Sequence, residues 1–373
     1  MSPSKDSPIR IGVIGCGGFG LFSLQHFTQV PGVQLVGMAG THRPAALAAA
    51  KRFGIPDIVE VETLATSDDV DLIYIATPPF LHHEQAMLAL EAGKHVICEK
   101  PLAMDLAQAD EMVATARERG LVLVANLMQR YNPLCEKVKT LVDGKLLGDF
   151  LYAHFENCAN DEGLGPEHWF WDRAKSGGIF VEHGVHFFDL FAGWLGPGRI
   201  VAAQHGMRPG TDIEEHVNCT ARYGDTGIVN FYHGFHQPGR MDRQEARLTF
   251  ERGDVRLYEW IPTQVAIHAV ADEAGTRALC DLFPGARLDV TLNYGGADRA
   301  CKGRHKDLDV YQMIEMHYGE GDNKMHNYGE LLRRMIRDQI AWIRDPDHER
   351  VITEQNGYDS LAMALDATRL ANA

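Results

Sequence analysis

The feature that most constrains the fold is a glycine-rich loop close to the start of the chain. An apolar run of strand type, residues 9–14, leads directly into glycines with the spacing G-x-G-x-x-G. Such glycines allow a tight turn, close approach of the backbone to a pyrophosphate, and close packing of a helix on a strand. The helix that follows offers free N–H groups and a positive dipole end to an anion. A glycine-rich turn without a ligand has the same pattern, but here it opens a βαβ sequence, so we predict a dinucleotide site at Gly15, Gly17, Gly18, Phe19 and Gly20.

Apolar runs alternate with helical patterns from residue 9 to about residue 126, which is typical of a parallel sheet covered by helices on both faces. The strands that we expect are 9–14, 33–39, 72–76, 95–98 and 122–125. The helices that we expect between them are 21–29, 44–53, 82–92 and 106–119. A doubly wound sheet of this kind binds its ligand at the carboxyl ends of the strands.

The character of the sequence changes after a connecting helix, which is expected from Pro133 to about Val142 with Asn132 as its cap. The later segments are short, partly alternating and separated by Gly or Asp, as in an antiparallel sheet. They are residues 150–156, 200–206, 216–223, 227–235, 245–251 and 254–260, and two helical segments, 323–344 and 355–371, close the chain. We therefore predict an α/β protein with a dinucleotide-binding domain over residues 1–130 and a second domain over residues 131–373. The closing helices can pack back on the first domain.

The composition argues against several classes of partner. A length of 373 residues with 45% hydrophobic residues suffices for a core in each of two domains. The formal net charge of −15 argues against nucleic acid or an anionic membrane surface as the main partner. No stretch reaches the roughly 20 apolar residues that span a bilayer, and the first residues lack signal-peptide features, so we expect a cytoplasmic protein. The seven scattered cysteines, never in C-x-x-C spacing, are expected to be buried thiols.

The end of the second expected strand decides which dinucleotide fits, because an acid there would bind the adenosine ribose 2′-hydroxyl. This chain has no acid at that place and reads Gly40-Thr41-His42-Arg43 instead. Thr41 and Arg43 are suited to a 2′-phosphate, as in NADP. Arg43 is equally suited to stack on the adenine of NAD, so both cofactors stay open on the sequence alone.

Two further motifs follow strands that end at the same edge of the sheet. The tripeptide Ala76-Thr77-Pro78 is expected beside the central part of the cofactor, with His82 at the start of the next helix, where capping or packing is its commoner role. Glu99 and Lys100 follow the next strand. A partly desolvated lysine at a strand end can exchange a proton with a substrate hydroxyl, although such a lysine is usually only solvated.

The chain resembles the Gfo/Idh/MocA oxidoreductases. The resemblance rests on the glycine loop, on Ala76-Thr77-Pro78 with His82, on Glu99-Lys100-Pro101, and on the segment 176–186, in that order, and it covers residues 9 to 371. It implies an N-terminal Rossmann domain and a C-terminal α/β domain with an open, mainly antiparallel sheet. Such a sheet is often used for oligomerisation in this family, so a homodimer or homotetramer is expected.

The resemblance also implies a catalytic set. The family uses the lysine of its E-K-P motif with an aspartate and a histidine in D-x-G-x-H, and these positions are held here by Lys100, Glu182 and His186. Glutamate replaces aspartate at position 182, so direct action of Glu182 on the substrate is an alternative to the family's role. Glu182 and His186 share a face if their segment is helical, where a carboxylate orients an imidazole and raises its proton affinity.

His183 places a second imidazole beside this pair, as a packing residue, a further acid or base, or a substrate contact. The order Glu-His-x-x-His differs from the zinc motif H-E-x-x-H and no third ligand is identifiable, so no metal is expected.

Substrate-binding candidates are aromatic and charged side chains, because aromatic faces pack on sugars while Asp and Arg bind hydroxyls or an anion. An ordinary core role for the two tryptophans is equally compatible with the pattern. The candidates are Trp169, Trp171, Asp172 and Arg173, together with Arg130 and Tyr131, which stand where the resemblance places substrate-facing residues.

Three functions are compatible with these motifs. The first, which we favour, is an NAD(P)-dependent oxidoreductase acting on a ring hydroxyl of a sugar, sugar derivative or cyclic polyol, with proton transfer by Lys100 and His186 and hydride transfer to nicotinamide C4. The second is a redox-neutral glycoside hydrolase, as found among relatives of the family, with tightly bound NAD and with Glu182 and His183 as additional acid and base. The third is a non-catalytic dinucleotide sensor.

Overall fold

The structure is a computed structural model that describes residues 7–40, 43–319 and 323–373. The chain forms two compact units, each assembled from separate stretches of sequence. Unit 1 comprises Met1–Tyr131, Pro166–Asp189 and Tyr328–Thr368, and unit 2 comprises Asn132–Gly165, Leu190–Asn327 and Arg369–Ala373.

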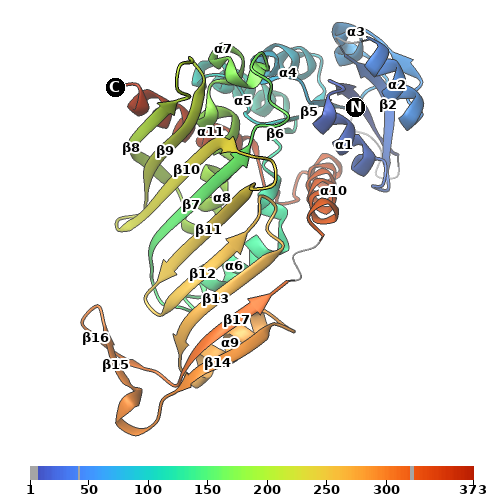
Figure 1. The fold of residues 1–373 in the computed structure, drawn as a ribbon. Helices are drawn as coiled ribbons and strands as arrows, with labels where there is room; N and C mark the ends of the chain where they lie inside the picture. The colour runs from blue at the N-terminus through green and yellow to red at the C-terminus, as the bar shows by residue number, and fades with distance from the viewer. Residues whose placement is uncertain (1–6, 41–42, 320–322) are drawn as a thin grey trace. The chain divides into compact units, whose positions relative to one another are not determined.

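A parallel sheet of six strands forms the centre of unit 1 in the described part of the chain (Figure 1). Its strands are β1 (Ile9–Ile14), β2 (Val33–Ala39), β3 (Asp57–Ile58), β4 (Leu72–Ile75), β5 (His95–Cys98) and β6 (Leu123–Ala125). They lie in the order β3-β2-β1-β4-β5-β6, so the direction of winding reverses between β1 and β4, where a doubly wound sheet places its ligand. The doubly wound prediction is confirmed, and the five predicted strands end within one residue of the observed bounds.

The helices of the first 131 residues follow the predicted alternation, with one addition. They are α1 (Gly18–Phe27), α2 (Arg43–Phe53), α3 (Val61–Thr66), α4 (His82–Glu91) and α5 (Leu106–Arg119). Sequence reasoning missed β3 and α3, because two and six residues are too short to show a period. Helix α1 begins three residues before the predicted start, so its first turn lies inside the glycine loop.

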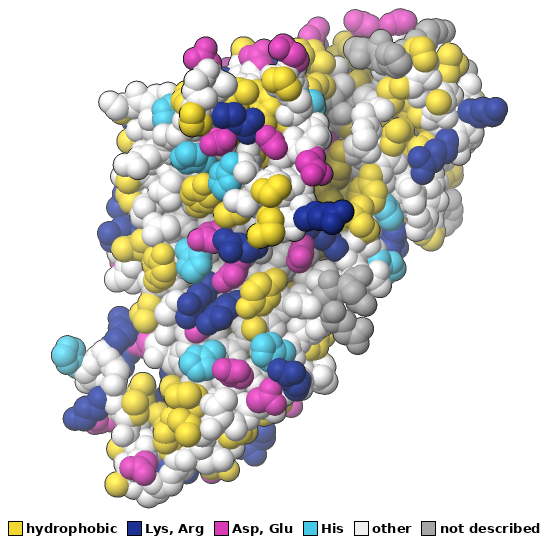
Figure 2. Space-filling model, in the orientation of Figure 1, with side chains coloured by type: hydrophobic (Ala, Val, Ile, Leu, Met, Phe, Trp, Pro, Cys, Tyr) yellow, Lys and Arg dark blue, Asp and Glu magenta, His cyan; other side chains and the backbone are white. Residues whose placement is uncertain are grey.

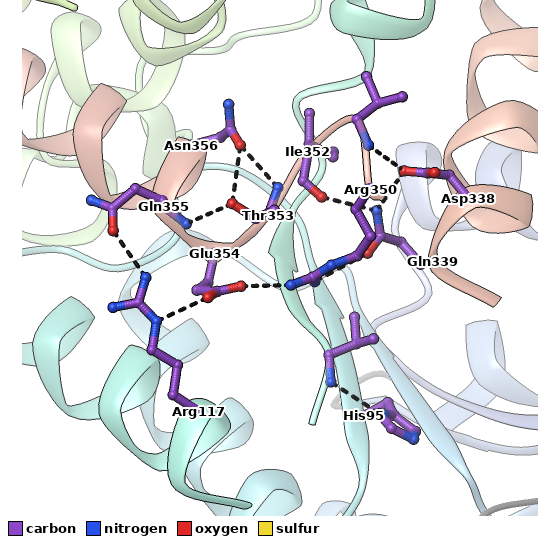
Figure 3. A network of polar contacts seen from close by, with 12 residues as sticks. His95, Arg117, Asp338, Gln339, Arg350, Ile352, Thr353, Glu354, Gln355 and Asn356 are labelled. Carbon is purple, nitrogen blue, oxygen red and sulfur yellow. Dashed lines mark hydrogen bonds and ion pairs between the residues drawn. The ribbon is translucent and has the colours of Figure 1, made fainter. Parts of the chain in front are cut away.

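Two C-terminal helices, α10 (Lys324–Arg344) and α11 (Glu354–Ala371), contribute residues 328–368 to unit 1. A polar network joins α11 to α5, because Glu354 accepts hydrogen bonds from Arg117 at 2.9 Å and from Arg350 at 2.8 Å (Figure 3). Close packing continues along α11, where a Cβ on Gly357 would lie 3.1 Å from Ala125 at the end of β6. These contacts place α11 beside the carboxyl end of the parallel sheet.

A mixed sheet of nine strands forms unit 2 in the described residues, in the order β14-β17-β13-β12-β11-β7-β10-β9-β8. Every neighbouring pair is antiparallel except β7 with β10. The strands are β7 (Phe150–Asn160), β8 (Gly198–Met207), β9 (Glu214–Tyr223), β10 (Gly227–Gln237), β11 (Arg243–Phe250), β12 (Gly253–Tyr258), β13 (Gln264–Ala271), β14 (Arg287–Asn293) and β17 (Gln312–Tyr318). The prediction of a mainly antiparallel open sheet is therefore confirmed.

One face of this nine-stranded sheet is apolar and buried, and the other is mixed. The helices α6 (Pro133–Asp143), α8 (Val185–Leu195) and α9 (Glu273–Leu282) lie behind the strands in Figure 1. Burial alternates along the strands, as in β11, and basic, acidic, histidine and apolar side chains are interspersed over the facing surface in Figure 2. A small hairpin of β15 (Ala300–Gly303) and β16 (Lys306–Asp309) completes the unit. No strand or helix was predicted between residues 260 and 323, so the elements from β13 to β17 are additions to the prediction.

Candidate active site

The glycine loop between β1 and α1 is shaped to bring its backbone close to a ligand. Gly15 has φ +103°, and a Cβ there would lie 2.6 Å from the carbonyl oxygen of Ala76 at the end of β4. A Cβ on Gly20 would lie 3.1 Å from the Cβ of Ala76. At Gly17 and Gly18, by contrast, no described atom beyond the chain neighbours and the helix's own backbone comes within 4 Å of that position. Two glycines are therefore required by packing, and the two between them leave the loop open to a pyrophosphate.

The start of α1 is free to bind an anion. Among the described residues, no side chain caps this helix at Gly17, so its first N–H groups are available. Phe19 turns toward the protein, where its ring lies 6.1 Å from Phe22 and 5.7 Å from Tyr328 of α10. These features fit a dinucleotide whose pyrophosphate sits at the helix terminus.

The loop after β2 leaves the choice of dinucleotide open. Gly40 directly follows this strand, and a Cβ on it would lie 2.5 Å from the sulfur of Cys16 in the glycine loop. Thr41 and His42 lie outside the described residues, as does the side chain of Arg43. Their cofactor contacts therefore stay predictions.

His82 connects two turns at the carboxyl edge of the sheet. Its Nδ1 lies 2.8 Å from the carbonyl oxygen of Pro101 and its Nε2 lies 2.8 Å from that of Thr77. The side chain is fully buried, and this burial lowers the pKa of His82. The residue therefore ties the turn after β4, which contains Pro78, to the Glu99-Lys100-Pro101 turn after β5.

Lys100 meets Glu182, 82 residues further along the chain. The Nζ of Lys100 donates a 2.8 Å hydrogen bond to the backbone carbonyl of Glu182 and forms an ion pair with its Oε1. Both side chains keep limited access to solvent, with exposed fractions of 17% and 14%. The structure thus brings together two of the three side chains that the family resemblance implies.

Glu182 and His183 lie on a widened helical turn, and His186 lies at the start of the α-helix that follows. Residues Phe180–Gly184 form a π-helix, and α8 continues from Val185, so the segment is not one continuous α-helix. The ring centroids of His183 and His186 lie 6.5 Å apart, nearly perpendicular to one another. Turns of the π type occur often at functional sites, where the extra residue redirects a side chain.

The charge of Lys100 acts on His183. Burial and, as the smaller cause, the positive charge of Lys100 together lower the pKa of His183 from 6.5 to about 3. The imidazole of His183 is therefore neutral at neutral pH, with a ring nitrogen that carries no proton.

The aromatic segment upstream of this turn lies close to the β4 edge. Residues Trp169–Trp171 form a short 3-10 turn, and the following helix α7 (Arg173–Ser176) packs against residues Pro79–Leu81. Trp169 and Trp171 are half-buried, while Asp172 caps α7 and pairs with Lys175 at 2.9 Å. The segment is placed beside the predicted cofactor path, and its substrate role stays a prediction.

Arg130 and Tyr131 are engaged with neighbouring helices. Arg130 donates two hydrogen bonds to Asp189, at 2.9 and 2.8 Å, and Asn356 of α11 donates a third to the same carboxylate at 3.0 Å. The hydroxyl of Tyr131, a buried residue, donates to Asp338 at 2.7 Å. Both side chains therefore make hydrogen bonds within the protein, and their contacts with substrate stay predictions.

Sequence reasoning missed three polar residues of this region: Tyr74, Asn126 and Asp189. Each carried a signal. Tyr74 stands in an otherwise aliphatic strand, Asn126 follows the last strand directly, and Asp189 is three residues from His186 on a helix. Among the described residues, no group of three or more His, Cys, Asp or Glu side chains is arranged to hold a metal ion. No helix in the described part of the chain is both long and apolar enough to span a membrane.

The parallel sheet, the glycine loop after β1 and Lys100 after β5 are together typical of the class of nucleotide-binding Rossmann proteins. Residues 9–127 match the oxidoreductase family with an NAD-binding Rossmann fold, and residues 135–256 match the GFO/IDH/MocA C-terminal domain. The chain belongs to the Gfo/Idh/MocA family, as the motifs indicated.

Two relatives of the chain are named as sugar reductases. The chain is 37% identical to a dTDP-3,4-didehydro-2,6-dideoxy-alpha-D-glucose 3-reductase of Streptomyces violaceoruber over 65% of this chain and 73% of that protein. It is 32% identical to a 1,5-anhydro-D-fructose reductase of Ensifer adhaerens over 56% of this chain and 63% of that protein. Other curated relatives are matched over only about half of their length, 45 to 48%.

A solved structure shares the fold over nearly the whole chain. Levoglucosan dehydrogenase, in complex with NADH and levoglucosan, superposes with a TM-score of 0.77, covers 98% of each chain and is 18% identical. At this identity the likeness establishes the fold alone.

Proposed function

We propose that the protein is an NAD(P)-dependent oxidoreductase that acts on a ring hydroxyl of a sugar, sugar derivative or cyclic polyol. The observation that carries this proposal is the pairing of Lys100 with Glu182 at the carboxyl edge of the parallel sheet. The names of two relatives, both sugar reductases, support the substrate class.

The open backbone at Gly17 and Gly18 would hold the dinucleotide pyrophosphate, and when bound the cofactor supplies a hydride acceptor at nicotinamide C4. NAD and NADP both fit the loop as far as it is described. The chain's own side chains handle the proton.

In this proposal Lys100 turns from Glu182 to the reacting hydroxyl, because an ammonium stabilises the negative charge that develops on that oxygen. The imidazole of His186 takes the hydroxyl proton. Glu182 holds Lys100 in position between turnovers through their ion pair.

A redox-neutral glycoside hydrolase is the second candidate. The position of His183, whose ring centroid lies 6.5 Å from that of His186, favours it, because this reaction needs an additional base beside the carbon that is oxidised. In this reading NAD would stay tightly bound and would supply a reversible hydride acceptor, while Glu182 and His183 would serve as acid and base for elimination of the aglycone and addition of water. A non-catalytic dinucleotide sensor is the third.

One experiment separates these functions. The protein is incubated in D₂O with NAD or NADP and a panel of sugars, cyclic polyols and aryl glycosides, and both cofactor absorbance and product labelling are followed. Net cofactor reduction without cleavage supports the dehydrogenase. Aglycone release, with deuterium at the carbon beside the oxidised one and no net reduction, contradicts it and supports the hydrolase. Dinucleotide binding without turnover of any substrate supports the non-catalytic sensor.

We also propose that the mixed face of the nine-stranded sheet binds a second copy of the chain, giving a dimer or tetramer. Tyr152 of β7 and Ile228 of β10 are neighbours on this sheet and are 37% and 38% exposed. A lysine at both positions would place charge in such an interface. Light scattering is expected to give an oligomer for the wild type and a smaller species for Tyr152→Lys/Ile228→Lys, and a monomeric wild type contradicts the proposal.

A further inference from the structure

A row of buried polar side chains crosses the parallel sheet beneath the Lys100 turn. It begins at Ser23 on α1, continues through Tyr74 on β4 to Glu99 after β5, and ends at Asn126 after β6. All four are at least 92% buried, with exposed fractions of 0, 0, 8 and 0%. Buried polar groups are costly unless they are hydrogen-bonded, so a row of this kind is held in one arrangement.

The hydrogen bonds of the row converge on the carboxylate of Glu99. The Tyr74 hydroxyl lies 2.5 Å from Oε1 of Glu99 and 2.8 Å from Oγ of Ser23. A phenol has one hydrogen, and the carboxylate can only accept, so Tyr74 donates to Glu99 and accepts from Ser23. Asn126 donates from Nδ2 to the same oxygen of Glu99 at 2.8 Å.

The row ends on the residue that directly precedes Lys100. The backbone N–H of Lys100 also bonds to the Glu99 carboxylate, so both the side chain and the following peptide are tied to one group. On the far side of the turn, the carbonyl of Pro101 lies 2.8 Å from His82. The backbone that carries Lys100 is therefore held at both ends.

Several ionisable groups face Glu99. Burial raises the pKa of Glu99, while the hydrogen bonds of Tyr74 and Asn126 and the positive charge of Lys100 act in the opposite direction. Cys98 is fully buried beside it, and the pKa of that thiol is raised by burial first and by Glu99 second. Loss of the Tyr74 donor would therefore make Glu99 retain its proton to a higher pH.

We propose that Tyr74 and Glu99 are positioning residues for Lys100. Ser23 connects them by hydrogen bonds to α1, the helix that starts in the glycine loop. Through this row the lysine and the dinucleotide loop share one rigid frame, which sets the distance between the proton-handling group and the cofactor. The inference rests on the proposed role of Lys100. Reacting groups must be held within fractions of an ångström, so greater mobility of the turn that carries Lys100 is expected to slow the reaction without abolishing binding.

The substitution Tyr74→Phe tests this inference because it removes the hydroxyl and keeps the ring, which packs on Phe27 with centroids 4.9 Å apart. We expect kcat to fall about tenfold, with the sugar KM and the dinucleotide Kd within about threefold, because positioning is lost and binding is kept. The acid limb of the kcat profile should move to higher pH, since Glu99 loses a donor to its ionised form. Ser23→Ala is expected to change kcat in the same direction by a smaller factor.

Tyr358→Phe is the matched control, because its hydroxyl bonds to Asp110 at the protein surface. It should leave kcat and the pH profile unchanged. If Tyr74→Phe lowers the melting temperature but leaves kcat and the acid limb as in the wild type, the row is only structural and the inference is overturned.

A measurement without substrate separates this inference from the proposed function. Lysines are labelled by reductive ¹³C-methylation and the Lys100 signal is assigned with Lys100→Arg. A changed shift or titration of this signal in Tyr74→Phe, and not in Tyr358→Phe, supports the positioning role even if the wild type turns over no sugar. An unchanged Lys100 signal overturns the role, even if Lys100→Met abolishes turnover as the proposed function requires.

Discussion

Two ion pairs join the edge of the parallel sheet to the same returning segment, residues 166–189, and they differ in how exposed their carboxylates are. Lys100 after β5 pairs with Glu182, and Arg130 after β6 pairs with Asp189. The first acceptor is 14% exposed and the second 2%. Lys100 offers a compact charge on a flexible stem, whereas the planar guanidinium of Arg130 makes two parallel hydrogen bonds that Asn356 supplements.

The difference indicates that the two ion pairs serve different purposes. The carboxylate of Asp189 accepts three hydrogen bonds, two of them from Arg130, and fixes the segment on the sheet. Lys100 can exchange one partner for another, and its charge still affects its surroundings, as the lowered pKa of His183 shows. Chemistry is therefore expected at the pair whose carboxylate keeps access to solvent, and stability at the pair whose carboxylate is buried.

The largest expected effect is on turnover at the first pair. Lys100→Met should lower kcat by at least about 10³-fold, roughly 4 kcal/mol, because it removes the charge that stabilises the reacting oxygen. Dinucleotide binding should stay within a few-fold, and His186→Ala should behave similarly. Lys139→Met removes an exposed lysine paired with Asp143 and serves as the control. Near-normal turnover in either active-site variant would show that its assignment is wrong.

The second pair should dominate stability instead. Arg130→Met leaves the buried carboxylate of Asp189 without its counter-ion, which should lower the free energy of unfolding by about 3 kcal/mol. Urea unfolding measures this loss, and the double variant Arg130→Met/Asp189→Leu should recover most of it. A loss below about 1 kcal/mol together with a raised sugar KM would instead support the predicted substrate contact of Arg130.

The charge of Lys100 should also appear in the pH dependence of stability. The pKa of His183 is lowered from 6.5 to about 3 in the folded chain, so the unfolded chain binds a proton there first as the pH falls. The contribution of this group is present above pH 6.5 and is lost toward pH 3. Between pH 7.5 and 5.0 the loss is about 2 kcal/mol.

His183→Asn should therefore flatten the stability profile by that difference, measured by urea unfolding at the two pH values. Lys100→Met should flatten it less, because burial is the larger cause of the shift. Parallel profiles for the wild type and His183→Asn would contradict the lowered pKa.

The smallest effect concerns the length of the acidic side chain in the first pair. Glu182→Asp restores the residue that the family has at this place, yet the shorter carboxylate retreats from Lys100. We expect kcat to fall about tenfold, or 1.4 kcal/mol, with little change in stability. Steady-state kinetics that match the wild type would show that the extra methylene is incidental.

Local pattern was enough for the doubly wound sheet, the glycine loop and the strand ends that carry Ala76 and Lys100. Apolar alternation and glycine spacing are properties of adjacent residues, and adjacent residues largely decide whether a strand or a tight turn forms. The exposed edge strand β14 was missed because it has no buried apolar face to mark its period, and β13 was missed although its burial alternates.

Tertiary structure alone decided which side chains meet at those strand ends. Lys100 and Glu182 are 82 residues apart, and Arg130 and Asp189 are 59 apart. The turn at Phe180–Gly184 is of the π type, which no i,i+4 pattern anticipates, and it sets where Glu182 stands. Such pairings depend on how the segment 166–189 returns to the sheet, and that path is set by long-range packing rather than by the residues of the motif themselves.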